Sequence, residues 1–204
     1  MATAVGILRN QAQARPNASA DAEIVQKSRT EPERFGAIFD RYFAEIHGYL
    51  ARRLTKDIAD DLAAETFLAA FRQRDRYDAE RGDVRAWLYG IATNLIKRHR
   101  RVELRAYHAI ERLGPQKDTD SHEERTTERV DAQSIQRQLA GALARLNAGD
   151  RDVLLLVALA GLSYTEVAQA LDIAYGTVCS RLNRARKHVR QSLGGADPTR
   201  EAQG

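Results

Sequence analysis

The sequence has little of several features that define common protein classes. Its 204 residues include one cysteine, Cys179, so no internal disulfide can form and a disulfide-stapled secreted scaffold is excluded. No stretch approaches the roughly 20 apolar residues that a membrane span requires, and the N-terminus lacks the apolar core of a signal peptide. We therefore expect a soluble, cytoplasmic protein without membrane insertion.

Residues that catalytic chemistry requires are also sparse. The five histidines are scattered, and there is no glycine-rich phosphate loop, nucleophile elbow or metal-ligand spacing. We predict that the chain is not an enzyme and holds no metal or cofactor. With 32 Lys and Arg against 28 Asp and Glu, the net charge is only +4, so the placement of the bases matters more than their sum.

Apolar residues recur at steps of three and four in the first half of the chain, which is the period of an amphipathic helix. The pattern predicts a unit over residues 31–112 with three helices: one over 35–50, one after Asp57, and one from Val84 to about Arg112. The residues predicted to face its core are Phe35, Ile38, Phe39, Tyr42, Phe43, Ile46, Tyr49, Leu50, Ile58, Leu62, Phe67, Leu68, Val84, Trp87, Leu88, Ile91 and Leu95.

A second helical unit is predicted over residues 135–193, and no segment alternates as a strand would. Residues 113–134 hold six acids against three bases and almost no apolar residue, which predicts a flexible acidic linker. Residues 1–30, rich in Ala, Gln, Asn and Ser, and residues 194–204 are predicted to be tails. The predicted fold is all-α, with two small helical domains joined by the linker.

The C-terminal unit contains the pattern of a helix-turn-helix motif. Ser163 and Glu166 have the spacing of a capping box, and Leu162 and Val167 are placed to form the accompanying hydrophobic staple. Residues 172–174 then supply a three-residue turn before the next helix.

The second helix of this motif carries bases without acids. Residues 177–190 contain five Lys or Arg and no Asp or Glu. A helix of this kind suits the major groove of DNA, where cations bind phosphates and Arg, Asn and Ser read base edges. The alternative is a solvated basic face on an ordinary helical hairpin. The residues predicted to face outward are Ser180, Asn183, Arg184 and Lys187, with Arg181, Arg186, His188 and Arg190 on the flanks.

The third helix of the first unit carries a second basic patch, in which aromatic residues are interleaved with bases. This combination suits single-stranded nucleic acid, because a ring can stack on an unpaired base. The alternative is that the aromatic rings belong to the core. The candidate residues are Trp87, Tyr89, Asn94, Lys97, Arg98 and Arg101.

The second helix begins with acids: Asp57, Asp60, Asp61 and Glu65. Acids at this end complement the helix dipole, which alone explains part of the pattern. A di-metal carboxylate site is a second interpretation, but it would need a Glu-x-x-His pair on each of two helices, which is absent. A docking face for a basic protein partner is the third.

Three segments, residues 60–68, 85–94 and 176–186, resemble the extracytoplasmic-function (ECF) sigma factors, the minimal type of bacterial RNA polymerase sigma subunit. The resemblance implies that the first unit is sigma region two, which binds the polymerase clamp coiled coil and opens the minus-ten element. The second unit would be region four, which contacts the polymerase flap and reads the minus-thirty-five element. An anti-sigma factor is a further candidate partner. The implied core-polymerase-binding residues are Asp57, Asp60, Asp61, Glu65 and Phe67.

The resemblance also implies roles in promoter binding. Asn94 and the loop over residues 78–83 would hold a flipped promoter base, while Arg181 and Arg186 suit phosphates. Gly90 departs from the family pattern, in which this position is frequently basic. The residues implied at the minus-thirty-five element are Thr177, Cys179, Ser180, Arg181, Asn183, Arg184, Arg186 and Lys187.

The main alternative is a two-domain helix-turn-helix regulator that binds operator DNA as a dimer, without polymerase. For a sigma factor, the two promoter elements would lie on the order of 70 Å apart, which an extended linker of about 22 residues just spans. We expect the two units of the free chain to be loosely related, with any closed packing masking both DNA-binding faces.

Overall fold

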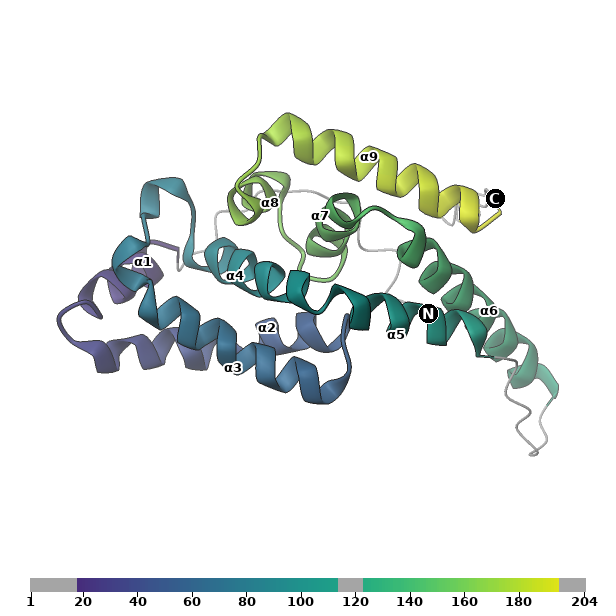
Figure 1. The fold of residues 1–204 in the computed structure, drawn as a ribbon, viewed down its shortest axis with the longest axis horizontal. Helices are drawn as coiled ribbons and strands as arrows, with labels where there is room; N and C mark the ends of the chain where they lie inside the picture. The colour runs from purple at the N-terminus through teal and green to yellow at the C-terminus, as the bar shows by residue number, and fades with distance from the viewer. Residues whose placement is uncertain (1–17, 114–122, 195–204) are drawn as a thin grey trace.

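We describe the protein from a computed structural model that places residues 18–113 and 123–194, with side chains of the second segment described from residue 132 (Figure 1). This part of the chain is helical and contains no strand, as the all-α prediction requires. It also contains no helix that is long and apolar enough to cross a membrane.

The N-terminal unit consists of helices that pack around a core of aromatic and aliphatic side chains. Short 3-10 turns precede α2 and connect α3 to α4, and Asp83 caps α4 by accepting a 2.7 Å hydrogen bond from the amide of Ala86. The elements are α1 (Ala18–Lys27), η2 (Pro32–Phe35), α2 (Gly36–Ala51), α3 (Lys56–Arg72), η3 (Arg74–Arg76), η4 (Ala79–Arg81), α4 (Val84–Arg98) and α5 (Arg100–Arg112).

The C-terminal unit contains the helix-turn-helix that the sequence predicts. Its helices are α6 (Glu123–Arg145), α7 (Ala148–Ala158), α8 (Tyr164–Leu171) and α9 (Tyr175–Ser192). The capping box is confirmed, because Ser163 and Glu166 exchange side-chain and backbone hydrogen bonds of 2.6 and 3.2 Å. Leu162 and Val167 are both buried, as the hydrophobic staple requires.

The predicted N-terminal tail is wrong over residues 18–30. Residues 18–27 form α1, in which Val25 is fully buried and joins the core. Asp21 is 1% exposed and accepts a 2.5 Å hydrogen bond from Tyr42. The large apolar residues of this helix are only Ile24 and Val25, so its sequence pattern is weak. Asp21 also pairs with Arg41 of α2, which ties the helix to α2 through a buried carboxylate. Residues 1–17 lie outside the described residues.

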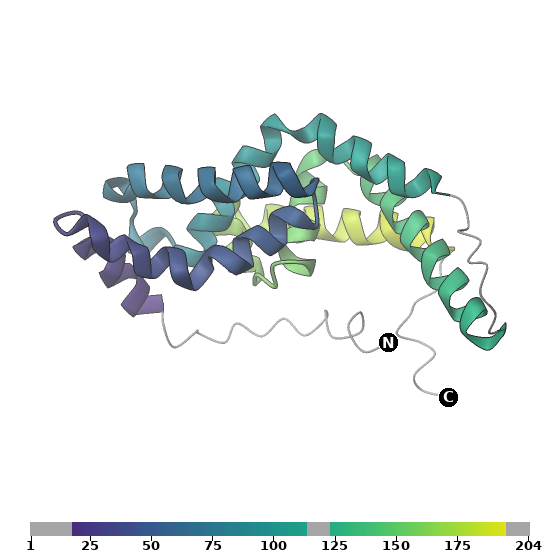
Figure 2. The ribbon, with the colours of Figure 1, turned by 90° about the horizontal axis from the view of Figure 1, so that it is seen from below.

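The predicted linker is shorter than the sequence suggests. Residues 123–134 belong to α6, whereas 114–122 and the predicted tail over 195–204 lie outside the described residues. α6 lies beside α5, as Figures 1 and 2 show, and Arg145 donates a 2.6 Å hydrogen bond to Glu111 across the pair.

The predicted third helix is two helices. It breaks at His99, where φ is −102° and ψ is 15°, and α5 leaves in a new direction. The break directs Glu103 and Tyr107 of α5 into the interior, where they are 0% and 5% exposed. Burial raises the pKa of the Tyr107 phenol.

The two units pack against each other and share one core, which differs from the expected loose relation. α8 lies against α4 (Figure 1). α7 contributes buried charged residues, among them Asp152, to the boundary. Arg53 is fully buried there: it donates a 2.7 Å hydrogen bond to Glu103 and a 2.6 Å hydrogen bond to Asp152 of α7. Burial disfavours its charge, but Tyr49, Glu103 and Asp152 raise the pKa of Arg53 overall.

Candidate nucleic-acid and polymerase interfaces

α9 presents the predicted minus-thirty-five residues on its outer face. Val178, Leu182 and Ala185 are buried, which fixes the orientation of the helix. Ser180, Asn183, Arg184 and Lys187 are consequently exposed, and Thr177, Cys179, Arg181 and Arg186 are half-buried at its flanks. The structure therefore brings the predicted residues together on one helix with a continuous polar and basic surface.

Neighbouring helices position several of these bases. Arg184 donates hydrogen bonds of 2.9 and 3.0 Å to the two carboxylate oxygens of Asp150, which is 4% exposed as a side chain. These hydrogen bonds and the charge of Asp150 raise the pKa of Arg184. Arg186 donates a 3.1 Å hydrogen bond to the hydroxyl of Tyr164 on α8. The sequence gives no sign of the Asp150 contact, because 34 residues separate its partners.

The basic patch of α4 and α5 is largely exposed. Asn94, Lys97, Arg98 and Arg101 all face solvent, and the ammonium of Lys97 donates a 2.6 Å hydrogen bond to the Asn94 amide oxygen. The side-chain amide of Asn94 is thus fixed by Lys97, which lies one turn further along α4.

The two aromatic candidates differ. Trp87 is half-buried and packs against Tyr77, with ring centroids 5.0 Å apart. Tyr89 is only 1% exposed and makes an edge-to-face contact with Tyr49 at 5.1 Å. The ring of Tyr89 thus belongs to the core in this structure, as the alternative interpretation holds, and its contact with promoter bases stays a prediction. Burial also raises the pKa of Tyr89.

The loop over residues 78–83 is held from several sides. Asp78 accepts a 3.0 Å hydrogen bond from the amide of Glu80, and the Tyr77 hydroxyl donates one of 3.0 Å to the Gly82 carbonyl. Arg29, just beyond α1, donates a 2.9 Å hydrogen bond to the Tyr77 carbonyl. Burial raises the pKa of Tyr77 to about 12. The loop therefore has a defined shape beside the N-terminus of α4.

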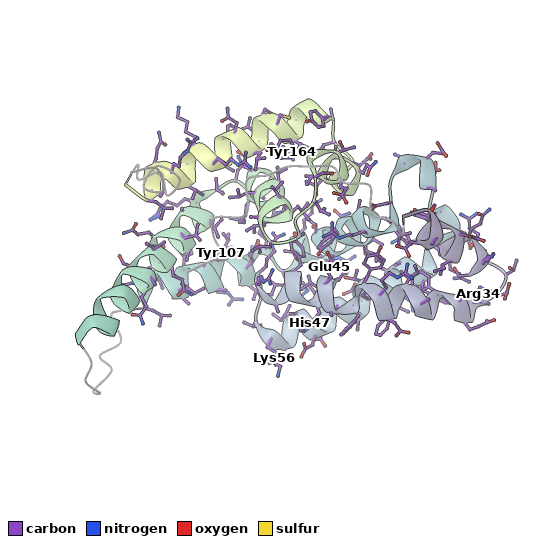
Figure 3. All side chains as sticks on the ribbon, turned by 180° about the vertical axis from the view of Figure 1, so that it is seen from behind. Arg34, Glu45, His47, Lys56, Tyr107 and Tyr164 are labelled. Carbon is purple, nitrogen blue, oxygen red and sulfur yellow. The ribbon has the colours of Figure 1, made fainter. Side chains whose placement is uncertain are left out.

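The acidic residues of α3 lie along an exposed face. Asp57, Asp60 and Asp61 are exposed, with Asp60 2.6 Å from the His47 ring of α2, which Figure 3 labels. Glu65 is half-buried and accepts a 3.1 Å hydrogen bond from Arg98. Among the residues that the structure describes, no three His, Cys, Asp or Glu side chains gather as metal ligands would.

Phe67 lies beneath this face instead of on it. Its ring is 4% exposed and packs edge-to-face against Phe39, with centroids 5.0 Å apart. The ring is therefore buried in this arrangement, and its contact with polymerase stays a prediction. Phe39 and Leu68, which the sequence places in the core, are 40% and 47% exposed. The two helices that carry the acids and His47 therefore also carry two exposed apolar side chains, Phe39 and Leu68, here called the apolar patch, whose exposure helical periodicity alone does not reveal.

Comparisons with known proteins agree with the two-unit architecture. The model of sigma-70 region 2 matches residues 38–106, and that of sigma-70 region 4 matches residues 136–189. The fold and these matches define a two-domain, all-helical transcription initiation protein. The chain belongs to the ECF RNA polymerase sigma factors, and it is an RNA polymerase sigma factor for transcription initiation. The alternative of a helix-turn-helix regulator without polymerase is not favoured.

Several relatives share most of the chain. It is similar to the ECF sigma factor SigL of Mycobacterium tuberculosis, with 33% identity over 77% of this chain and 87% of the relative. It is also similar to BldN of Streptomyces coelicolor, with 29% identity over 88% of this chain and 69% of the relative.

Solved structures share the fold. CnrH, solved in complex with the cytosolic domain of CnrY, has a TM-score of 0.59 at 21% identity, covering 87% of this chain and 99% of CnrH. RpoE of Bartonella quintana, solved with the anti-sigma factor NepR, has a TM-score of 0.53 at 21% identity, covering 79% of this chain and 98% of RpoE.

Proposed function

We propose that this sigma factor binds the promoter through two surfaces, one for duplex DNA and one for single-stranded DNA. α9 reads the minus-thirty-five element as duplex DNA, with Ser180, Asn183 and Arg184 facing base edges. The surface of α4 with the loop over residues 78–83 takes the minus-ten element as a single strand. The observation that carries this proposal is the separation of two exposed basic surfaces, one on a helix-turn-helix and one beside a shaped loop.

The single-strand surface can bias promoter opening without nucleotide hydrolysis. Extruding a base costs a few kcal/mol, and stacking on an aromatic ring returns about 1–3 kcal/mol per base. Trp87 supplies a half-buried ring, and Asn94 supplies an amide for a base edge. Capture of transiently unpaired bases thereby holds an opening that would otherwise close.

The acidic face of α3 is the proposed surface for core RNA polymerase. Asp57, Asp60 and Asp61 supply exposed negative charge, and the patch of Phe39 and Leu68 supplies apolar area beside it. Charge at the rim and apolar residues at the centre are typical of protein interfaces. A basic coiled coil of the polymerase clamp fits this chemistry, and region four would contact the flap.

An anti-sigma factor is a further proposed partner. The support is structural similarity to CnrH and RpoE, whose solved complexes contain CnrY and NepR respectively.

The deciding experiment is run-off transcription with purified bacterial core polymerase on a genomic library. Initiation at a defined set of promoters supports the proposal. If the chain binds duplex operators alone and never directs initiation, the proposal fails.

A further inference from the structure

The first turn of α7 lies against α9 and contacts two of its arginines (Figure 1). Arg184 bonds to Asp150, the third residue of α7. One turn earlier on α9, Arg181 lies over the α7 backbone, since a Cβ atom placed on Gly149 would be 2.8 Å from its Nη1. Two cations beside a helix N-terminus face the positive end of its dipole, which is unfavourable without an acid. Asp150 supplies that acid.

The carboxylate of Asp150 is fixed by its own helix. Its side chain is 4% exposed. Asn147, the N-cap of α7, accepts a 2.9 Å hydrogen bond from the Asp150 amide, and its side-chain amide donates one of 2.8 Å to the carboxylate. A carboxylate held in this way can hold the guanidinium of Arg184 in one orientation.

The two bonds to Asp150 use one edge of the Arg184 guanidinium. They come from Nε and Nη2, whereas the planar fork has a second edge, formed by Nη1 and Nη2. The side chain of Arg184 is 59% exposed although the two units of the chain pack together. The expectation that closed packing masks both DNA-binding faces is therefore wrong for α9, and the second edge of Arg184 is accessible to DNA.

Holding an arginine before DNA arrives changes what the contact costs. Guanine presents two acceptors in the major groove, O6 and N7, which match two donors on one edge of an arginine. A mobile side chain must first lose its rotational freedom, which lowers affinity by about 2- to 12-fold for each side chain ordered. Because Asp150 already orders Arg184, most of this loss does not occur on binding.

We propose that Asp150 is a positioning residue for promoter reading, which fixes Arg184 so that its Nη1–Nη2 edge meets a guanine of the duplex element. This inference rests on the proposed function, because it concerns the same surface of α9. It adds a residue of α7 that contacts no base itself. Neutralising Asp150 also removes an acid near the phosphates, which favours every DNA sequence alike. Base preference is therefore the measure of its role, not total affinity.

The test uses Asp150→Asn in the full chain with core polymerase, with Asp172→Asn as the matched control. Both changes remove one carboxylate from the helix-turn-helix unit with little change of shape, but Asp172 is exposed in the turn before α9 and pairs with Arg81. Duplexes bound from a randomised pool are sequenced, which gives the base preference at each position. Arg184→Lys, which keeps the charge but lacks the fork, identifies the position that Arg184 reads.

We expect Asp150→Asn to lower the guanine preference at that position by about 2- to 12-fold and to leave the other positions unchanged. Asp172→Asn should leave all positions unchanged. In the Arg184→Lys background, Asp150→Asn should cause no further loss, because it acts only through the fork. If Asp150→Asn does not fold, Asp150→Glu, which keeps the charge but displaces the carboxylate by one methylene, carries the same expectation.

Three results would overturn the inference: equal guanine preference in Asp150→Asn and Asp172→Asn, a further loss in the Arg184→Lys background, or a base other than guanine at the position that Arg184→Lys affects. A purely structural role of Asp150 would appear as a lower melting temperature with equal weakening at every position. The failure of the proposed function is distinguishable, because the wild-type chain would then not direct initiation with core polymerase. A chain that initiates normally, yet keeps its guanine preference in Asp150→Asn, refutes the positioning alone.

Discussion

Replacing the buried carboxylate of Glu103 by an amide tests how the charged boundary contributes to stability. Glu103 is 0% exposed, accepts a 2.7 Å hydrogen bond from Arg53, and lies 3.4 Å from Arg151. Glu103→Gln keeps the shape of the side chain but removes the charge shared by these two buried guanidiniums. Removing one partner of a buried ion pair costs about 3–5 kcal/mol, because a buried charge loses its compensation. Arg53 keeps its bond to Asp152, whereas Arg151 loses the carboxylate beside it.

The assay is urea unfolding followed by circular dichroism, supported by thermal melts. In a chain of this length, each kcal/mol corresponds to about 2–4 °C, so the melting temperature falls by about 6–20 °C. The matched control is Glu111→Gln, whose carboxylate pairs with Arg145 at the surface, where a pair is worth about 0–1 kcal/mol. If the two variants lose the same stability, Glu103 does not compensate the buried guanidiniums and the reasoning is refuted.

Further predictions concern the proposed interfaces and the buried tyrosines. Asn94→Ala is expected to impair open-complex formation on duplex promoter more than on a pre-melted bubble; equal loss on both would contradict base capture. Arg184→Ala is expected to lose base preference in a promoter-variant screen at a cost of about 1–3 kcal/mol, whereas uniform weakening would indicate a phosphate contact. Glu65→Lys is expected to weaken core-polymerase pull-down with the fold intact, and unchanged binding would argue against the α3 face. The pKa of Tyr77 is raised from 10.0 to about 12. Because the folded state favours the protonated phenol, the contribution of Tyr77 to the free energy of unfolding is present below pH 10 and is lost as the pH rises toward 12. Midpoints of urea unfolding measured across this pH range test the loss, and in Tyr77→Phe the midpoint should fall less with pH.

The elements that follow from local pattern are those that sequence reasoning predicts well. The capping box at Ser163, the turn over residues 172–174 and the inward row of Val178, Leu182 and Ala185 each depend on residues within one or two helical turns. These features can be predicted from the sequence alone, because the hydrogen bonds and the apolar periodicity that define them lie within one segment. The fold class and the outer face of α9 are therefore accessible from the sequence.

The residues that sequence reasoning misplaces are those whose surroundings come from distant segments. Periodicity places Phe39 and Leu68 on the apolar sides of α2 and α3, but it does not reveal that their side chains are 40% and 47% exposed. Tyr89 differs in the opposite sense: its neighbours in the sequence suggest an exposed aromatic residue, yet Tyr49 of α2 packs against its ring. Whether a distant segment covers a side chain decides each case, and no local pattern records it.

The helical start of α6 changes how the chain can reach two promoter elements. With residues 123–134 helical at 1.5 Å per residue, residues 113–134 span about 50 Å when the remainder is extended, not about 70 Å. The remaining distance must come from the dimensions of the units themselves. We expect the units to supply it by lying apart on the promoter, which would release α8 from Gly90 of α4. The prediction can be checked by the distance between labels on α4 and α9, which should increase when the chain and core polymerase bind a promoter that carries both elements.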